Sequence, residues 1–268
     1  MKPIGDGNTP WLSIIVPTRG RPEQLRCFIE SLEATTLEPA GIEIVIVTDH
    51  DDETAEQLPK TTLHLKHQRV PPKLTMGALN RAGYEVAVGD WIFLLNDDVA
   101  ARTRGWDRRI QGTTRILADG IGLIHVNDGI FGEHLCTFPL VSRKFCDIVG
   151  GICRAEYNRY RIDDDIHDIF KLLNDRGYNR VLYLEDILFH HFNRDQADQY
   201  HPDPAIQAKD TALYNSFLPR RKASALDLVE HIESAKTNLT RAIERLRWII
   251  RHPRKAIGST FGVFRAVP

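Results

Sequence analysis

Cysteine is scarce in this sequence, and the few thiols present form no recognisable pattern. Cys27, Cys136, Cys146 and Cys153 are scattered and include no CxxC pair. Zinc sites and small disulfide-stapled domains need closely spaced cysteines, so this spacing argues against both classes. From this usage we expect a reducing, cytoplasmic compartment.

Long apolar runs are also missing. No stretch approaches the roughly 20 apolar residues needed to cross a bilayer, so we expect no transmembrane segment. The polar start at residues 1–6 does not have the features of a signal peptide. The formal net charge of −1 gives the chain as a whole no drive toward nucleic acid or an anionic membrane, so any phosphate recognition must be local.

The sequence does have the composition of an ordinary folded protein. With 268 residues, 42% hydrophobic and 26% charged, it can build one full core plus an appendage. Strand-like segments lie at residues 12–16, 42–48, 62–66 and 91–95. Helix-like segments separate them, the first marked by apolar residues at i, i+3, i+4 and i+7: Leu25, Phe28, Ile29 and Leu32. This alternation predicts an α/β fold with a mostly parallel, doubly wound sheet.

The second half of the sequence is less regular. We expect helices at residues 73–86, 103–117 and 163–177 and strands at 121–126 and 181–184, with loops over 129–160. A long helix over 223–251 has apolar residues at a/d-like spacing, namely Val229, Ile232, Leu239, Ile243, Leu246 and Ile250, and arginines on its outer face, namely Arg241, Arg245, Arg247 and Arg251. It could pack on the domain, pair with another subunit or touch an anionic surface. Packing or pairing is preferred, because charged faces are usually just solvated.

Two adjacent acids follow the apolar strand at 91–95. Asp97 and Asp98 would be expensive to bury unpaired, so something positive is expected beside them. Ligands of open α/β sheets gather outside the carboxyl ends of the strands, where a metal-bound phosphate could sit. The alternative is a solvated turn after a core strand.

Three further polar segments belong to the same edge of the predicted sheet: Pro17-Thr18-Arg19, the acidic loop that begins at Asp49, and residues 73–81. With Asn96-Asp97-Asp98 they give the sequence, from about residue 12 to 109, a pattern that resembles the family 2 glycosyltransferases of the GT-A fold. The resemblance implies a GT-A glycosyltransferase domain at 1–215, with a donor half at about 10–126 and an acceptor half at about 127–215. Residues 216–268 would form a C-terminal helical extension.

The resemblance also implies a donor site. The donor would be a nucleotide diphosphate-sugar, with UDP as first choice, and Mn²⁺ or Mg²⁺ would neutralise the leaving diphosphate. Asp98 would bind the metal directly and Asp97 would meet the sugar or ribose, while Asn96 departs from the first Asp of a strict DxD motif.

Residues on the neighbouring strand ends would hold the nucleotide. Pro17, Thr18 and Arg19 would lie under it, and Asp49 would accept from the uracil or ribose. Arg19 could instead pair with Asp49 as a structural bridge. Lys73 would reach a phosphate, with Asn80 one to two turns along the same helix; surface exposure is the alternative for Lys73.

Inverting relatives place a catalytic base at the start of a later helix. Here the resemblance implies Asp165 as first choice and Asp164 as second, although an acidic first turn can serve only the helix dipole. Many relatives also supply a His as a further metal ligand. His191 is the candidate, with His190 its neighbour; alternation along a strand lets only one of the two reach the metal.

The sequence thus predicts a metal-dependent, inverting glycosyltransferase that moves a hexose or N-acetylhexosamine to a hydroxyl of an unidentified glycan or other acceptor. No nucleic-acid partner is expected, and a homo-oligomer through the C-terminal helix is possible. One alternative is a nucleotidylyltransferase, but residues 17–22 contain only one Gly where its phosphate loop needs several. The other is a non-catalytic module that binds sugar nucleotides or glycans.

Overall fold

The computed structural model describes residues 9–57, 61–117, 119–192 and 203–251. Contacts divide the chain into two compact units, unit 1 at Met1–Leu228 and unit 2 at Val229–Pro268. The predicted division after residue 215 stays a prediction. Each unit is described by itself below.

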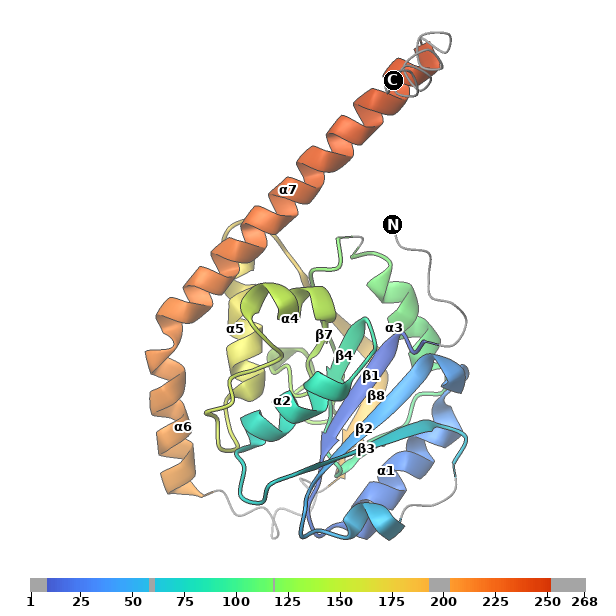
Figure 1. Cartoon of the computed structure of the whole chain (residues 1–268), viewed down its shortest axis with the longest axis vertical. Helices are drawn as coiled ribbons and strands as arrows, with labels where there is room; N and C mark the ends of the chain where they lie inside the picture. Colours follow the sequence, from blue (N-terminus) through green and yellow to red (C-terminus); the bar gives the residue numbers. More distant parts are fainter. Residues whose placement is uncertain (1–8, 58–60, 118, 193–202, 252–268) are drawn as a thin grey trace, which may run out of the picture. The chain divides into compact units, whose positions relative to one another are not determined.

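Unit 1 is built on an eight-stranded sheet with the order β3-β2-β1-β4-β7-β6-β8-β5 (Figure 1). The strands are β1 Leu12–Pro17, β2 Ile42–Asp49, β3 His64–Val70, β4 Trp91–Leu94, β5 Val99–Ala101, β6 Leu123–Asn127, β7 Leu140–Ser142 and β8 Val181–His191. The helices are α1 Pro22–Thr35, α2 Met76–Val86, α3 Trp106–Thr114, α4 Arg143–Val149, α5 Ile162–Asn174, α6 Pro204–Ser216 and α7 Leu218–Arg251, with short 3₁₀ turns η1 Pro39–Gly41, η2 Thr54–Gln57 and η3 Gly132–His134.

The first four strands of the chain form the parallel part of the sheet. β1 pairs in parallel with β2 and β4, and β2 pairs in parallel with β3. Every residue of β1, β2 and β4 is buried, which explains why these strands are near-continuous apolar runs. The predicted parallel order of this half is confirmed.

Helices cover both faces of this parallel part (Figure 1). The apolar stripe of α1 joins the same core cluster as Ile14, Ile44 and Phe93, which lie on one face. On the other face, Gly83 of α2 comes so close to Ile15 that an added Cβ would lie 2.5 Å from its Cγ2. The sheet is therefore doubly wound, as the alternation of strands and helices predicted.

The second half departs from the prediction in several places. β5, β7, α4 and α6 were not expected. Because β7 and α4 lie within residues 129–160, that segment is not the continuous loop that the sequence suggested. β5 and β7 have three residues each, too few to leave a periodic signal. β8 is one strand to His191 rather than a strand ending at 184, since the exposed residues 185–186 interrupt its apolar pattern without ending it.

Unit 2 contains the distal part of α7, residues 229–251. The helix was predicted to begin at residue 223 and begins at Leu218. Ile243 is 40% exposed and Leu246 is 58% exposed. The side chains of Leu239, Arg245 and Ile250, and that of Arg251, lie outside the described residues. Within the described part of the chain, no helix is long and apolar enough to cross a membrane.

Candidate active site

A cavity of about 810 Å³ opens at the carboxyl ends of β1, β2 and β4. Eleven of the residues singled out from the sequence line it: Pro17, Thr18, Arg19, Asp49, Lys73, Asn80, Asn96, Asp97, Asp98, Asp164 and His191. Asp165 and His190 do not belong to its lining. Residues that are far apart in the sequence thus meet at one sheet edge, where ligands of open α/β sheets bind.

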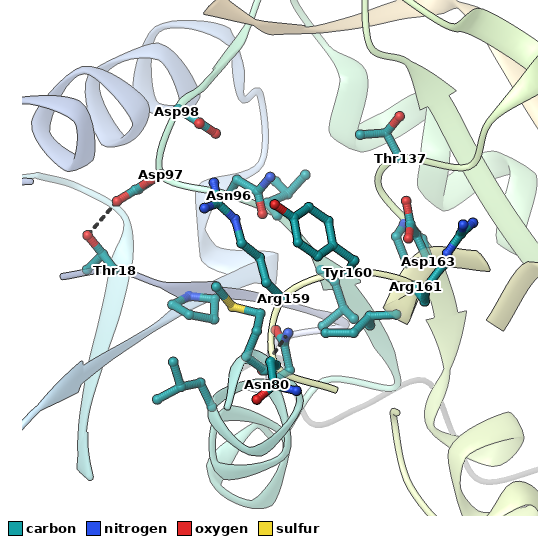
Figure 2. Close-up of a pocket in the computed structure, with 18 of the residues that line it drawn as sticks. Thr18, Asn80, Asn96, Asp97, Asp98, Thr137, Arg159, Tyr160, Arg161 and Asp163 are labelled. Carbon is teal, nitrogen blue, oxygen red and sulfur yellow. Dashed lines mark hydrogen bonds between the residues drawn. The ribbon is translucent and has the colours of Figure 1, made fainter. Parts of the chain in front are cut away.

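Asp97 is held rigidly beneath the cavity. The Thr18 hydroxyl donates a hydrogen bond of 2.6 Å to Asp97 Oδ2 (Figure 2), and Arg21 Nη1 lies 3.1 Å from Oδ1. Burial raises the pKa of Asp97, while the Thr18 hydrogen bond and the Arg21 charge act in the opposite direction. Both oxygens are already engaged by protein groups, which leaves Asp97 better suited to orient a ligand than to bind a metal alone.

Asp98 forms a pair with His191 across two strands. β5 and β8 are antiparallel, and their register sets Val99 opposite His191. This brings His191 Nε2 to 3.0 Å from Asp98 Oδ1, with both side chains largely buried. His190 lies by Gly129 instead, where an added Cβ would come 3.0 Å from His190 Cδ2.

The Asp98–His191 pair fits a divalent cation that is shared with a ligand. Among the described residues, no group of three or more His, Cys, Asp or Glu side chains is arranged to hold a metal. Mg²⁺ and Mn²⁺ at phosphate sites use one or two protein ligands and complete their shells with phosphate oxygens and water. An imidazole beside a carboxylate suits Mn²⁺ better than Mg²⁺.

Arg19 bridges the acidic loop after β2. It forms ion pairs with Asp49 and with Asp51, the latter at 2.8 Å, although its own side chain is 55% exposed. The structural bridge that the sequence left open as an alternative is therefore present. Asp49 nevertheless lines the cavity, so a nucleotide that enters would meet a carboxylate already positioned by an arginine.

The three acids at the start of α5 have different surroundings. Asp163 and Asp164 line the cavity, and Arg161 Nη1 lies 2.9 Å from Asp164 Oδ2. Asp165 is only 3% exposed, and Arg221 Nη1 lies 2.8 Å from its Oδ1. Burial raises the pKa of Asp165, and the Arg221 contact opposes that shift. The structure thus brings two of the three acids to the cavity, and the third into a buried ion pair.

A loop at residues 158–161 contributes side chains that the sequence did not mark. Arg159 and Tyr160 project into the cavity toward the side that holds Asn96 (Figure 2). Asp210 of α6 holds the loop, accepting hydrogen bonds from the backbone N–H groups of residues 158, 159 and 160 and from Asn158 Nδ2 at 2.8–2.9 Å. No local sequence motif predicts that this loop reaches the cavity, because the residue that anchors it lies fifty residues further along the chain.

Two lining residues have unusual backbone conformations. Lys73 has a φ of 68° and Arg161 a φ of 71°, and among the described residues no other non-glycine residue has a positive φ. A left-handed conformation costs a residue with a Cβ on the order of 1 kcal/mol or more and persists only where its surroundings enforce it. Such residues cluster at functional sites, which agrees with their place at the cavity.

Comparisons with known proteins come from both sequence and structure. Residues 13–111 match the family described as "Glycosyl transferase family 2". A search of curated proteins found no match.

Solved structures give more extensive alignments. TarS from S. aureus aligns over 82% of this chain and 42% of that chain, with 14% identity and a TM-score of 0.54. TarS 1–349 in complex with UDP-GlcNAc aligns over 76% of this chain and 65% of that chain, with 15% identity and a TM-score of 0.54. This chain therefore spans less than two thirds of either TarS chain. The mannosyltransferase PcManGT from Pyrobaculum calidifontis, in complex with GDP-Man and Mn²⁺, aligns over 97% of this chain and 88% of that chain, with 16% identity and a TM-score of 0.49.

The sheet order, the flanking helices and the cavity at the strand ends define a GT-A fold. Within that class, residues 13–111 match the model of glycosyl transferase family 2, the family that the sequence resembles. The resemblance expected from the sequence is confirmed, and the family match leaves the nucleotidylyltransferase alternative without support.

Proposed function

We propose that this protein transfers a hexose or N-acetylhexosamine from a nucleotide diphosphate to a hydroxyl group of a glycan or other acceptor, with inversion and with a divalent cation. The observation that carries the proposal is a single cavity that joins the Asp97–Asp98 pair, His191 and the acidic start of α5. Its volume of about 810 Å³ lies within the range of small-molecule sites and leaves room for a sugar nucleotide.

The nucleotide would lie over Pro17 and Thr18, with Asp49 accepting from the base or ribose. Lys73 and Arg159 both line the cavity and would pair with the diphosphate. UDP is the first nucleotide to test, in line with the UDP-GlcNAc complex of TarS 1–349.

Asp98 and His191 would hold the cation, Mn²⁺ before Mg²⁺. When bound, such a cation neutralises charge on the departing diphosphate. Asp97, fixed by Thr18 and Arg21, would accept from a sugar or ribose hydroxyl and so set the orientation of the donor.

The catalytic base would come from Asp164 or Asp163. An inverting base must reach the acceptor oxygen, within about 3 Å, on the side of the sugar away from the diphosphate. Asp163 and Asp98 lie on opposite sides of the cavity (Figure 2), which supports a base from this turn of α5. Asp165, the first choice from the sequence, now fits a structural role better because it is buried against Arg221.

Calorimetry with UDP and GDP, with and without Mn²⁺, tests the donor site. We expect one nucleotide to bind and Mn²⁺ to strengthen its binding. If neither nucleotide binds under any condition, the proposal that this protein is a glycosyltransferase is wrong. A nucleotide that binds without any transfer to a range of sugar acceptors would favour the non-catalytic module.

Single substitutions separate the three candidate bases. If Asp164 is the base, Asp164→Asn should lower the transfer rate by on the order of 10²- to 10⁴-fold while sparing donor affinity. Asp163→Asn is the matched comparison on the same turn. Loss of transfer in a folded Asp165→Asn variant, with both others active, would return the base to Asp165.

The cytoplasmic location stays part of the proposal. All four cysteines lie in the described residues and are free thiols, three of them buried. Burial raises the pKa of the Cys146 and Cys153 thiols to about 12, so these two are unreactive at neutral pH.

A further inference from the structure

The nearly neutral net charge of this chain conceals a strong separation of charge between its two units. Residues 229–268 contain eight Lys and Arg but only three Asp and Glu, a formal charge of +5. Because the whole chain carries −1, residues 1–228 carry −6. Within residues 234–268, Glu244 is the single acid against all eight cations. A basic segment of this kind beside an acidic domain indicates a separate anionic partner.

The distal part of α7 presents apolar side chains as well as cations. Ile243 and Leu246 lie three residues apart, hence on one face of the helix, and are 40% and 58% exposed. At about 100° per residue, Arg247 lies at the edge of that face and Arg241 on the opposite one, and both are exposed. An exposed apolar stripe with a cationic remainder is the pattern of a helix that lies in a lipid interface.

We propose that the distal part of α7 binds the surface of an anionic lipid bilayer. Ile243 and Leu246 would enter the boundary between headgroups and acyl chains, while Arg241 and Arg247 stay with the lipid phosphates. The helix lies on the membrane rather than across it, since no helix in the described residues is long and apolar enough to span one.

The charges favour lipid over the other occupants of this helix. A second copy would bring one strongly cationic segment against another, and like charges across an interface are destabilising. Nucleic acid would satisfy the cations through its phosphates but would leave the exposed apolar pair in water. An anionic bilayer satisfies both features at once.

Flotation of the full chain with vesicles tests this proposal. We expect binding to phosphatidylcholine vesicles that contain phosphatidylglycerol and much weaker binding to phosphatidylcholine alone. Arg241→Glu with Arg247→Glu should weaken the partition by on the order of 20-fold or more, because each cation near an anionic surface contributes about fivefold. Leu246→Asn should weaken it by roughly tenfold through lost apolar burial.

Matched variants on unit 1 control for charge and hydrophobicity. Arg104→Glu with Arg115→Glu makes the same change of charge at exposed positions, and Ile116→Asn removes an isoleucine that is 73% exposed. Both should bind vesicles as the unchanged chain does. Circular dichroism reports whether each variant is folded, and Ile243→Asn replaces Leu246→Asn if the latter is not.

Three outcomes would overturn the proposal. The first is no binding to anionic vesicles, or binding that the α7 variants leave unchanged. The second is a dimer, detected by sedimentation, that Leu246→Asn dissociates in a protein that does not bind vesicles. A second copy of the chain would then be the partner. The third is salt-sensitive binding to duplex DNA that survives Leu246→Asn. Vesicle binding is measured without donor or acceptor, so its failure and that of the proposed transferase are distinguishable.

Discussion

His191 lies 3.0 Å from Asp98, and His190 beside it faces Gly129. These adjacent histidines therefore make a matched pair for testing the cation site. His191→Asn and Asp98→Asn should each weaken Mn²⁺-dependent nucleotide binding, by on the order of 10- to 100-fold, because each removes one of the two proposed protein ligands. His190→Asn should leave it unchanged. Calorimetry with UDP at fixed Mn²⁺ measures all three, and equal losses at His190 and His191 would refute the assignment.

The lowered pKa of Asp210 predicts the direction in which the stability of the fold changes with pH. Burial by itself would raise its pKa, but hydrogen bonds from Asn158 and from backbone N–H groups of the 158–160 loop lower it overall below the ordinary value of 3.8. A carboxyl whose pKa is lower in the folded protein stabilises the fold above its unfolded pKa. That contribution is lost as the pH falls below about 3.8 and toward the folded pKa.

Urea unfolding between neutral pH and pH 3 tests this expectation. Asp210→Asn should be less stable than the unchanged protein at neutral pH, and the difference should shrink as the pH falls. Asp203, the N-cap of the same helix, offers a comparison, since its side chain accepts hydrogen bonds from the backbone N–H groups of residues 205 and 206. A difference that stays constant with pH would show that Asp210 acts through packing alone.

Single residues also mark the limit of what the sequence could predict for the site. Thr18, Asp97 and Asp98 follow apolar strands and carry a recognisable pattern, so the local sequence is sufficient to identify them. It is not sufficient for Arg159 and Tyr160, because their loop reaches the cavity only through its anchor at Asp210.

Asp165 shows the same limit for a buried ion pair. Its partner Arg221 is 56 positions away in the sequence. Nothing in the local sequence distinguishes Asp165 from the two acids that precede it, so the sequence could not predict which of the three is buried.

At the scale of elements, the packing of α2 depends on residues 154–157, which approach Gly77 closely just before the 158–161 loop. The backbone N–H of Gly77 donates to Tyr157 O at 2.9 Å, and a Cβ on Gly77 would lie only 2.0 Å from Arg154 O. Gly77→Ala should therefore destabilise the protein by about 1–3 kcal/mol, as overpacking does. It should also weaken donor binding, because residues 158–161 line the cavity.

Gly112 in α3 is the matched control for Gly77. It is exposed, and an added Cβ would meet nothing within 4 Å. Gly112→Ala should stabilise the protein by about 0.5–1 kcal/mol through helix propensity. Urea unfolding of the two variants should give changes of opposite sign. The same sign for both would mean that the contact at Arg154 O gives way without cost.

The elements found from the sequence are those with long apolar patterns. β1, β2 and β4 lie in the middle of the sheet and are fully buried, so their apolar runs reflect tertiary structure directly. β5 and β7 are short and antiparallel, and their existence depends on partners elsewhere in the chain. A strand of three residues has little conformational preference of its own without those partners. No sequence pattern therefore predicted either strand.

At the scale of the whole molecule, the start of α7 belongs to unit 1. Arg221 is 2% exposed, and its Nη1 lies 2.8 Å from Asp165 Oδ1 and donates to Tyr214 O at 2.7 Å. A chain that ends at Leu228 keeps these contacts and should fold and bind nucleotide. A chain that ends at Asn215 loses the Arg221 contact and keeps the longer one to Arg154, whose Nε lies 4.0 Å from Asp165 Oδ2, so it should be much less stable.

The variant Arg221→Met tests the same contact in the full chain. Removing one partner of a buried ion pair costs about 3–5 kcal/mol, which urea unfolding would detect. Asp165→Leu combined with Arg221→Met should recover much of that loss, because no charge is then left buried. If Arg221→Met and the chain ending at Asn215 are both as stable as the unchanged protein, the boundary predicted after residue 215 is the better one.

The pairing of β5 with β8 has a consequence for the order in which this protein becomes competent. Residues 13–111, which carry the family pattern, include Asp98 but not His191. During synthesis the ribosome therefore releases β1, β2 and β4 well before the imidazole that would complete the proposed cation pair with Asp98. An unfinished chain has the carboxylate alone, so on the proposed assignment it should bind a metal-bound donor more weakly until residue 191 has been made. This order of synthesis would limit hydrolysis of the sugar nucleotide by a nascent chain.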